Sequence, residues 1–210
     1  MPKKKPSRPK DLRRAVLDAS LALLEEGGVA ALSMREVARR AHVTHGAPYH
    51  HFPDRGAILA ALAAEGFALL TEGMKAAMGP ERLGSIERFE AAGLAYVRFA
   101  LEHTAYMRIM FRPELMLPLE HPAVDEGAAC AMGALLACVA ECQTAGSIPR
   151  GDPGPVVLTS WAAVHGLASL WIDGPLSRFH PGVAPEELAK TVATTLGSLL
   201  VSAERKRATR

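Results

Sequence analysis

Three short segments with helical periodicity follow one another between Asp11 and Pro53, and this succession constrains the fold more than any other feature of the chain. The first segment predicts a helix over residues 11–26, because its apolar residues recur every three or four positions, at Leu12, Val16, Ala19 and Leu23. Gly27-Gly28 then predicts the end of that helix, since glycine readily adopts the conformation that closes one.

The second segment opens with a helix-capping pattern. Residues 33–36, SMRE, have the S-x-x-E form of a capping box. In such a box the Ser33 side chain accepts a hydrogen bond from the Glu36 amide, while Glu36 reaches back to the Ser33 amide. The pattern predicts a short helix that runs to about Ala41.

A turn and a third short segment follow. His42-Val43 interrupts the pattern, Thr44 is a suitable N-cap, and the third helix is expected from about His45 to Phe52, where Pro53 discourages helix in the residue before it. A helix, a tight turn and a second short helix form the unit that places a recognition helix in the major groove of DNA. We therefore expect a helix-turn-helix motif here.

The remainder of the chain has the pattern of longer helices. They are expected over residues 55–78, 85–103, 104–111, 122–145, 155–173 and 185–205. Ala supplies 37 of the 210 residues and aromatic residues only 5%, a composition that favours helices over sheets. We expect an all-α protein of about nine helices, with a disordered basic arm over residues 1–10, a three-helix head over 11–54 and a larger helical bundle over 55–205.

The net charge of +2 conceals a gradient along the chain. Residues 1–60 hold 11 Lys and Arg against 6 Asp and Glu, whereas residues 61–210 hold 13 against 16. A basic amino-terminal part indicates a polyanionic partner. The arm residues Lys3, Lys4, Lys5, Arg8 and Lys10 fit contacts with the DNA backbone or minor groove, although a merely solubilising tail explains them as well.

Three cysteines and one uncharged stretch bear on the cellular compartment. Cys130, Cys138 and Cys142 are an odd number in one short region, which argues against a disulfide framework and favours a reducing cytoplasm. Thiol sensing or metal binding with His121 is an alternative to buried, inert cysteines. Residues 153–172 lack charged side chains over a length that spans a bilayer, but their Pro, Gly and hydroxyl content favours a buried helix of a soluble bundle.

Residues 32–62, LSMREVARRAHVTHGAPYHHFPDRGAILAAL, resemble the DNA-binding signature of TetR-type transcriptional regulators. The resemblance extends back to about residue 11, and its most specific part is the run Tyr49-His50-His51-Phe52 followed by Arg55. It implies that seven residues contact DNA: Arg35 at a guanine edge, Thr44, His45 and Gly46 at base edges or phosphates, and Tyr49, His50 and Arg55 at phosphates.

Two features of the third segment depart from a regular recognition helix. Pro48 falls inside it, and it carries no Lys or Arg. Base reading would then depend on Arg35, His45 and the basic arm. His50 and His51 as a metal pair are the alternative reading, which is disfavoured because adjacent residues on a helix point about 100° apart.

The carboxyl-terminal half resembles the C-terminal domain of a subset of TetR-type proteins marked by Trp, His and Gly on one helix, here Trp161, His165 and Gly166. Family membership implies a small-molecule cavity. The residues expected to line it are Tyr96, Phe99, His103, Met107, Phe111, Met132, Trp161 and His165. A packed core, with His165 satisfied by a hydrogen bond, is the alternative for the same residues.

The last two long helices are expected to pair with their copies in a second subunit, as the family resemblance suggests. The final helix has an apolar stripe at Leu188, Val192, Leu196, Leu199 and Ala203. We expect a cytoplasmic, homodimeric repressor that a small hydrophobic effector releases from a pseudo-palindromic DNA operator, with no enzymatic activity, cofactor, metal or membrane partner. The alternatives are a DNA-binding dimer without an effector and a metal- or thiol-dependent helical enzyme, although no H-E-x-x-H or C-x-x-C spacing occurs.

Overall fold

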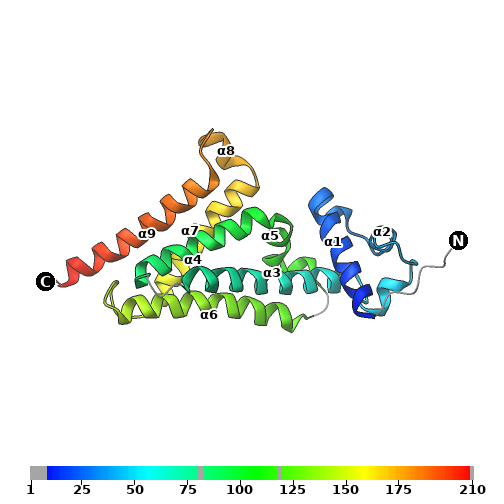
Figure 1. Ribbon diagram of the computed structural model, residues 1–210, viewed down its shortest axis with the longest axis horizontal. Coiled ribbons are helices and arrows are strands. Elements are labelled where there is room, and N and C mark those ends of the chain that lie inside the picture. Colours follow the sequence, from blue (N-terminus) through cyan, green and yellow to red (C-terminus); the bar gives the residue numbers. More distant parts are fainter. Residues whose placement is uncertain (1–8, 80–82, 118–119, 209–210) are drawn as a thin grey trace. The chain divides into compact units, whose positions relative to one another are not determined.

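The computed structural model of the chain describes residues 9–79, 83–117 and 120–208, with the side chains of all these except residues 9–11, 177 and 204–208 (Figure 1). Within these ranges the chain is helical and has no strand, so the all-α prediction is confirmed. The basic arm was expected on residues 1–10, of which 1–8 lie outside the described residues, while Pro9 and Lys10 open the first helix.

The described residues form nine α-helices and two 3-10 helices. The α-helices are α1 (Pro9–Ala31), α2 (Met34–Arg40), α3 (Arg55–Met78), α4 (Ser85–Glu102), α5 (Thr104–Met110), α6 (Pro122–Thr144), α7 (Gly154–Ile172), α8 (Pro175–Phe179) and α9 (Pro185–Ala208). The 3-10 helices are η1 (Ala47–His50) and η2 (Pro113–Leu115). The long helices match their predicted ranges to within three residues at each end, except that α1 starts earlier and continues past a kink at Gly28; α8 and η2 were not predicted.

The predicted recognition helix is wrong in one respect, because residues 45–52 form no α-helix. The segment is reduced to the single 3-10 turn η1. Pro48 has no amide hydrogen to donate, so the hydrogen bonds on either side of it become short-range: the Ala47 amide donates to the Thr44 carbonyl at 2.9 Å, and the Tyr49 amide to the Gly46 carbonyl at 3.3 Å. The turn before it also departs from regular geometry, since His42 has φ of 55°.

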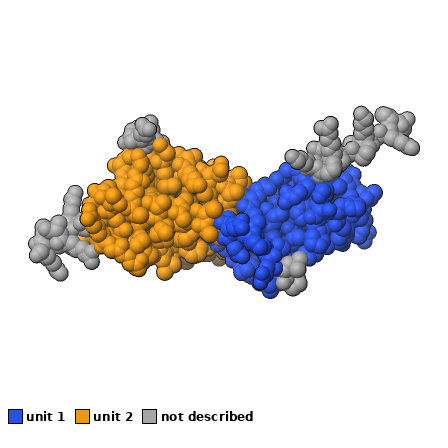
Figure 2. Space-filling model, turned by 90° about the horizontal axis from the view of Figure 1, so that it is seen from below, with its two compact units in different colours: residues 1–66, 104–127 blue, residues 67–103, 128–210 orange. Residues whose placement is uncertain are grey.

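The chain divides into two compact units, coloured separately in Figure 2. Unit 1 comprises residues 1–66 and 104–127, and unit 2 comprises residues 67–103 and 128–210. Helices α3 and α6 each continue from one unit into the other. Unit 1 therefore contains α5, which the sequence order would have placed with the larger bundle.

The core of unit 1 is built from the apolar faces of α1, α2, α3 and α5. Its fully buried large side chains are Val16, Leu17, Leu24, Leu32, Val37, Ile58, Leu59, Leu62 and Ile109. Phe52 closes this core beside η1 and is 3% exposed, with the Arg13 guanidinium 5.3 Å from its ring centroid. The short head segments are thus held by burial against longer helices rather than by their own helical propensity.

Unit 2 is a bundle in which α4 packs against α7 and α9 (Figure 1). Helix α9 buries two small residues against α4, Ala189 and Ala193. A second cluster joins α4, α6 and α7 through Phe89, Cys138, Val139, Cys142, Ile148 and Val157. Cys138 and Cys142 lie in this core as free thiols and Cys130 is exposed, so none of the three forms a disulfide.

Three helices, α3, α6 and α7, are long and apolar enough to cross a membrane by length and composition alone. From the sequence, only the segment that forms α7 was considered as a possible membrane span. In their most apolar windows, 56% of the α3 residues but only 22% of those in α6 and α7 are buried within the chain. Helices α6 and α7 consequently present apolar surface that this single chain does not cover.

Gly66, at the close approach of α3 to α5, is predicted to tolerate no side chain. A Cβ added there would lie 2.7 Å from Met110 Sδ and 3.0 Å from Tyr106 Cδ1. We expect Gly66→Ala to lower the free energy of unfolding by about 1–3 kcal/mol, as overpacking does in other cores. Chemical denaturation followed by circular dichroism measures this change.

Gly73 on the same helix is the matched control, since an added Cβ there would meet nothing within 4 Å. Gly73→Ala is expected to stabilise the protein by up to about 1 kcal/mol through helix propensity. Equal effects of the two substitutions would show that the contact with Met110 and Tyr106 does not limit position 66.

Candidate functional site

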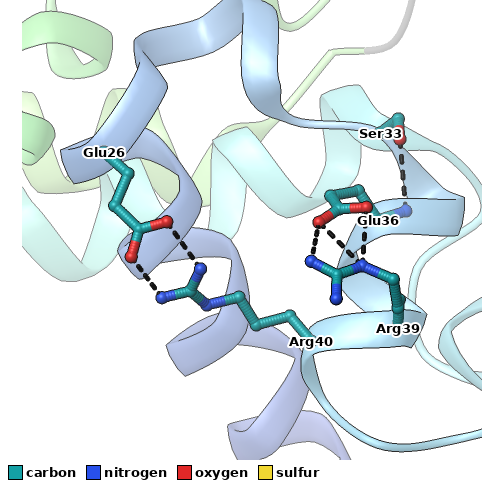
Figure 3. A network of polar contacts seen from close by, with 5 residues as sticks. All are labelled: Glu26, Ser33, Glu36, Arg39 and Arg40. Carbon is teal, nitrogen blue, oxygen red and sulfur yellow. Dashed lines mark hydrogen bonds and ion pairs between the residues drawn. The ribbon is translucent and has the colours of Figure 1, made fainter.

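The start of α2 is fixed by half of the predicted capping box. The Ser33 side chain accepts a hydrogen bond from the Glu36 amide at 3.2 Å, as expected. The Glu36 carboxylate, however, turns to Arg39, whose Nε lies 3.0 Å from both of its oxygens (Figure 3). The ion pair of Glu36 with Arg39, one helical turn further along α2, takes the place of the expected hydrogen bond from the Ser33 amide to Glu36.

Two ion pairs engage two of the three arginines of α2. Arg40 binds the Glu26 carboxylate of α1 in a bidentate manner, with Nη1 2.6 Å from Oε2, while Arg39 binds Glu36 (Figure 3). The hydrogen bonds from these arginines lower the pKa of both carboxyl groups. Arg35 is exposed and has no ion-pair partner among the described residues.

The residues predicted to contact DNA are gathered on the turn after α2 and on η1. Thr44, His45, Gly46 and His50 are exposed there, and Tyr49 is 48% exposed with its ring centroid 6.1 Å from that of His45. Pro48, between them, is buried. Because Pro48 and Phe52 point into unit 1, the polar side chains of the same segment are left facing outward.

Arg35 and Arg55 complete the predicted set from the two flanking helices. Both are exposed, and Arg55 Nη1 lies 3.4 Å from the Leu32 carbonyl oxygen, at the upper limit of a hydrogen bond. All seven residues are thus accessible. Accessibility agrees with the roles that the family resemblance implies, which remain predictions.

A partly buried polar network in unit 1 has no signal in the sequence pattern. Glu65 of α3 accepts hydrogen bonds from Arg14 Nη1 of α1 at 2.7 Å and from the Tyr106 hydroxyl of α5 at 2.6 Å. Burial alone would raise the pKa of Glu65, but the hydrogen bonds from Tyr106 and Arg14 outweigh it and lower that pKa. One carboxylate thereby joins three helices.

Unit 2 contains a cavity of about 30 Å³ that is partly open to the surface and has room for one or two water molecules. Its walls come from α3, α4, α6, α7 and α9. The lining residues are Met74, Phe89, Ala92, Gly93, Tyr96, Leu135, Ser160, Trp161, Val164, Ala193 and Leu196. None of them is charged, so the cavity is an apolar space with a few polar atoms.

Two of the residues predicted to line a cavity, Tyr96 and Trp161, do line this one. His165 lies behind them: its Nδ1 is 2.7 Å from the Tyr96 hydroxyl oxygen and its ring centroid is 5.8 Å from that of Trp161. Burial lowers the pKa of His165. The contacts of His165 agree with both interpretations of this residue: a histidine satisfied by a hydrogen bond within a packed core, and a residue beside a ligand cavity.

The other predicted lining residues lie elsewhere. Phe99 and His103 pack against each other at the end of α4, with ring centroids 5.0 Å apart, and Met132 packs on the core cluster around Phe89. Met107 and Phe111 belong to unit 1. The small residues Ala92, Gly93 and Ala193 also line the cavity, and no pattern of large apolar side chains indicates them.

The described residues contain no group of three or more His, Cys, Asp or Glu side chains able to hold a metal ion. His50 is exposed and His51 half-buried, which gives the alternative metal reading no support from geometry. Cys142 instead donates a hydrogen bond to the Ser85 carbonyl at 3.2 Å and packs in the core.

Comparison with known proteins identifies both parts of the chain. Residues 16–62 match the bacterial regulatory proteins of the tetR family, and residues 89–196 match the tetracyclin repressor-like C-terminal domain. The chain belongs to the TetR family. The Trp-His-Gly subtype suggested by residues 161, 165 and 166 is not part of this match and stays a prediction.

The relatives of this TetR protein agree with the assignment. It is 43% identical over 58 residues to the HTH-type transcriptional repressor KstR of Rhodococcus jostii, a match that covers 28% of this chain and 27% of the relative. It thus spans about a quarter of the length of the curated relatives it matches.

Among solved structures, a protein of unknown function from Rhodococcus sp. RHA1 is 34% identical, with a TM-score of 0.82 over 94% of this chain and all of that one. FadR of Bacillus subtilis in complex with stearoyl-CoA has a TM-score of 0.71 at 17% identity, covering 90% of this chain and 98% of that one. At this low identity, the similarity to FadR concerns the fold alone.

The lowered pKa of His165 predicts a pH dependence of stability. Below its ordinary value of 6.5, an unfolded histidine takes up a proton that folded His165 does not take up until a lower pH. Stability is therefore fully present above pH 6.5 and falls as the pH is lowered through that window, by up to about 1.4 kcal/mol per pH unit for one proton. Denaturation followed by the fluorescence of Trp161 and Trp171, both in unit 2, measures this dependence.

His165→Gln is expected to flatten this pH dependence below pH 6.5, because glutamine does not titrate. The matched control is His180→Gln, which changes an exposed histidine of the same unit and should leave the slope as it is. A His165→Gln protein with the slope of the wild type would show that other groups cause the acid sensitivity.

Proposed function

We propose that this TetR-family protein is a transcriptional repressor that binds operator DNA as a homodimer and is released by a small hydrophobic effector. The observation that carries the proposal is the outward-facing set Thr44, His45, Gly46, Tyr49 and His50, held on a turn whose apolar residues are buried. Repressor activity agrees with the KstR relatives, which are HTH-type transcriptional repressors.

In this proposal Arg35 reads a base edge and the turn residues set the register on DNA. Arg39 and Arg40 are engaged with Glu36 and Glu26, whereas Arg35 is exposed, so Arg35 is the α2 arginine best placed for a guanine contact. Tyr49, His50 and Arg55 contact phosphates, which position the protein without reading sequence. The short η1 limits how many side chains enter the groove.

The outer faces of α7 and α9 form the dimer interface in this proposal. Leu158 of α7 is 61% exposed and Leu199 of α9 is 63% exposed, and Leu170 near the end of α7 is 49% exposed. An equivalent apolar face on a second copy covers these side chains across a twofold axis. Two heads then reach half-sites about one helical turn of DNA, or a small multiple, apart.

Helix α3 connects the cavity to the head. It contributes Met74 to the cavity wall and, nine residues earlier, Glu65 to the network with Arg14 of α1. An effector that favours a cavity-opened conformer shifts α3 and thereby weakens operator binding, provided that it binds the two conformers with different affinity. We place this regulator in the cytoplasm and assign it no catalytic role.

The small size of the cavity favours a second candidate, a DNA-binding dimer without an effector. At about 30 Å³ the cavity has no room for an effector unless side chains move. The two candidates differ in whether any small molecule weakens operator binding.

Operator binding tests the head assignment. We expect Arg35→Ala/Tyr49→Ala to bind duplexes enriched by the wild-type protein from a random pool at least tenfold more weakly, since one lost base contact alone costs about 1–3 kcal/mol. The salt dependence of binding should change little, because neither Arg35 at a base edge nor the uncharged Tyr49 neutralises a phosphate in this proposal. Fluorescence anisotropy over a range of salt concentrations measures both.

The matched control is Arg98→Ala/Phe179→Ala, which removes an exposed arginine and an exposed aromatic ring outside the motif. It should bind DNA like the wild type. Full affinity in Arg35→Ala/Tyr49→Ala would sink the assignment of this surface to DNA.

The dimer interface is tested by placing charged side chains in the exposed apolar face of α7 and α9. Leu158→Glu/Leu199→Glu places carboxylates in the proposed interface and is expected to give a monomer by sedimentation at micromolar concentration, because the burial of unpaired charge is costly. Leu69→Glu/Leu117→Glu changes two other exposed leucines and should leave the dimer intact. A monomeric wild type, or a dimeric Leu158→Glu/Leu199→Glu protein, contradicts the proposed interface.

A further inference from the structure

The polar atoms on the cavity wall restrict the chemistry of its ligand. Of the eleven lining residues, only Tyr96, Ser160 and Trp161 have a side-chain oxygen or nitrogen. Tyr96 lies on α4, and Ser160 and Trp161 lie on α7. The remaining wall, from Met74 and Phe89 to Leu196, is apolar.

Each hydrogen-bond donor among these three residues already has an acceptor. The Ser160 hydroxyl donates to the Val156 carbonyl at 2.7 Å. The Trp161 indole N–H, which can only donate, is hydrogen-bonded to the Tyr96 hydroxyl. The Tyr96 hydroxyl proton is then directed to His165 Nδ1, 2.7 Å away, with the histidine proton on Nε2.

The oxygens of the same side chains keep acceptor capacity. A hydroxyl oxygen has two lone pairs, and Tyr96 uses one for Trp161, whereas the bond of Ser160 to Val156 uses its proton only. A ligand that donates a hydrogen bond meets this acceptor capacity at Tyr96 and Ser160 once the cavity enlarges. A ligand that needs a donor must break a bond that the protein already makes.

An anionic ligand group is disfavoured twice. The lining residues include no Lys or Arg, and the pKa of His165 is lowered by burial, so the histidine behind Tyr96 stays neutral at neutral pH. A carboxylate in this cavity would be buried without a counter-charge and without a spare donor, which costs several kcal/mol.

We propose that the cavity takes an uncharged, largely apolar molecule with a single hydrogen-bond donor, such as a phenol or an alcohol, and that Tyr96 and Ser160 accept that hydrogen bond. The proposal rests on the proposed effector response and names the chemical class of the effector. It distinguishes this chain from a protein that binds its ligand through a carboxylate or phosphate.

Entry of such a molecule requires the cavity to enlarge. The described conformation has about 30 Å³, less than an aromatic ring needs, and the side chains of Met74 and Leu135 at the wall have several rotamers each. The ligand therefore binds a conformer that differs from the empty one. A difference between the conformers is what an effector needs in order to act on DNA binding.

Three probes of one shape test the chemistry: 4-ethylphenol, which donates a hydrogen bond, 4-ethylanisole, which does not, and 4-ethylbenzoate, which is an anion at neutral pH. Binding to the full chain is followed by calorimetry and by Trp161 fluorescence in the Trp171→Phe protein. We expect 4-ethylphenol to bind about three- to tenfold more tightly than 4-ethylanisole, the worth of one hydrogen bond. The benzoate should show no binding in the same range.

Tyr96→Phe and Ser160→Ala each remove one acceptor, and their combination should abolish the preference for the phenol over the anisole while both still bind. Thr159→Val is the matched control, because it removes an exposed hydroxyl one residue away on α7. The melting temperature of each variant without ligand shows that it is folded.

Three results overturn the proposal: the benzoate binds as tightly as the phenol, the preference survives in Tyr96→Phe/Ser160→Ala, or none of the probes binds up to its solubility. Operator binding is measured on the same samples. If the probes bind in the expected order but DNA is not bound, the regulator proposal fails and the cavity assignment stands. If DNA is bound and the probes fail, only the ligand class is wrong.

Discussion

The carboxylate of Glu65 is the interaction on which the arrangement of unit 1 depends. It is a half-buried charge that would be unfavourable alone, and it is held ionised by Arg14 and Tyr106 from two other helices. Removal of either partner leaves a desolvated carboxylate, so α1 and α5 are held to α3 by more than apolar contact. Because α5 is thereby part of the same unit as the head, the compact units do not follow the order of the chain.

The helical framework followed from the sequence, because apolar spacing and breaking residues act over short distances. The ends of α3 and the Ser33 cap were both readable from neighbours within a turn or two. The same local reasoning failed where two local signals conflicted. In residues 45–52 helical spacing and Pro48 pointed in opposite directions, and the missing amide of Pro48 prevailed.

The same distinction between local and distant signals decides which parts of the candidate site could be predicted from the sequence. The exposed residues from Thr44 to His50 are contiguous in sequence, so a motif sufficed to find them. The network of Glu65 with Arg14 and Tyr106 joins residues 51 and 41 positions apart, and no periodicity indicates such a pair. The cavity was harder still to predict from the sequence, because it is a space left between side chains of several helices, and no single residue type indicates it.

Small residues reconcile the two demands made on unit 2, close helix packing and an internal space. Ala92, Gly93 and Ala193 allow α4 and α9 to approach, and a Cβ on Gly93 would meet only Val164 and Ala193, at 3.5 and 3.7 Å. Where small residues face each other the helices touch, and Tyr96, Ser160 and Trp161 are each fixed by a hydrogen bond, to His165, Val156 and Tyr96 respectively. The apolar side formed by Met74 and Leu135 has no such bonds and is held by dispersion alone. The cavity is therefore expected to open on that side.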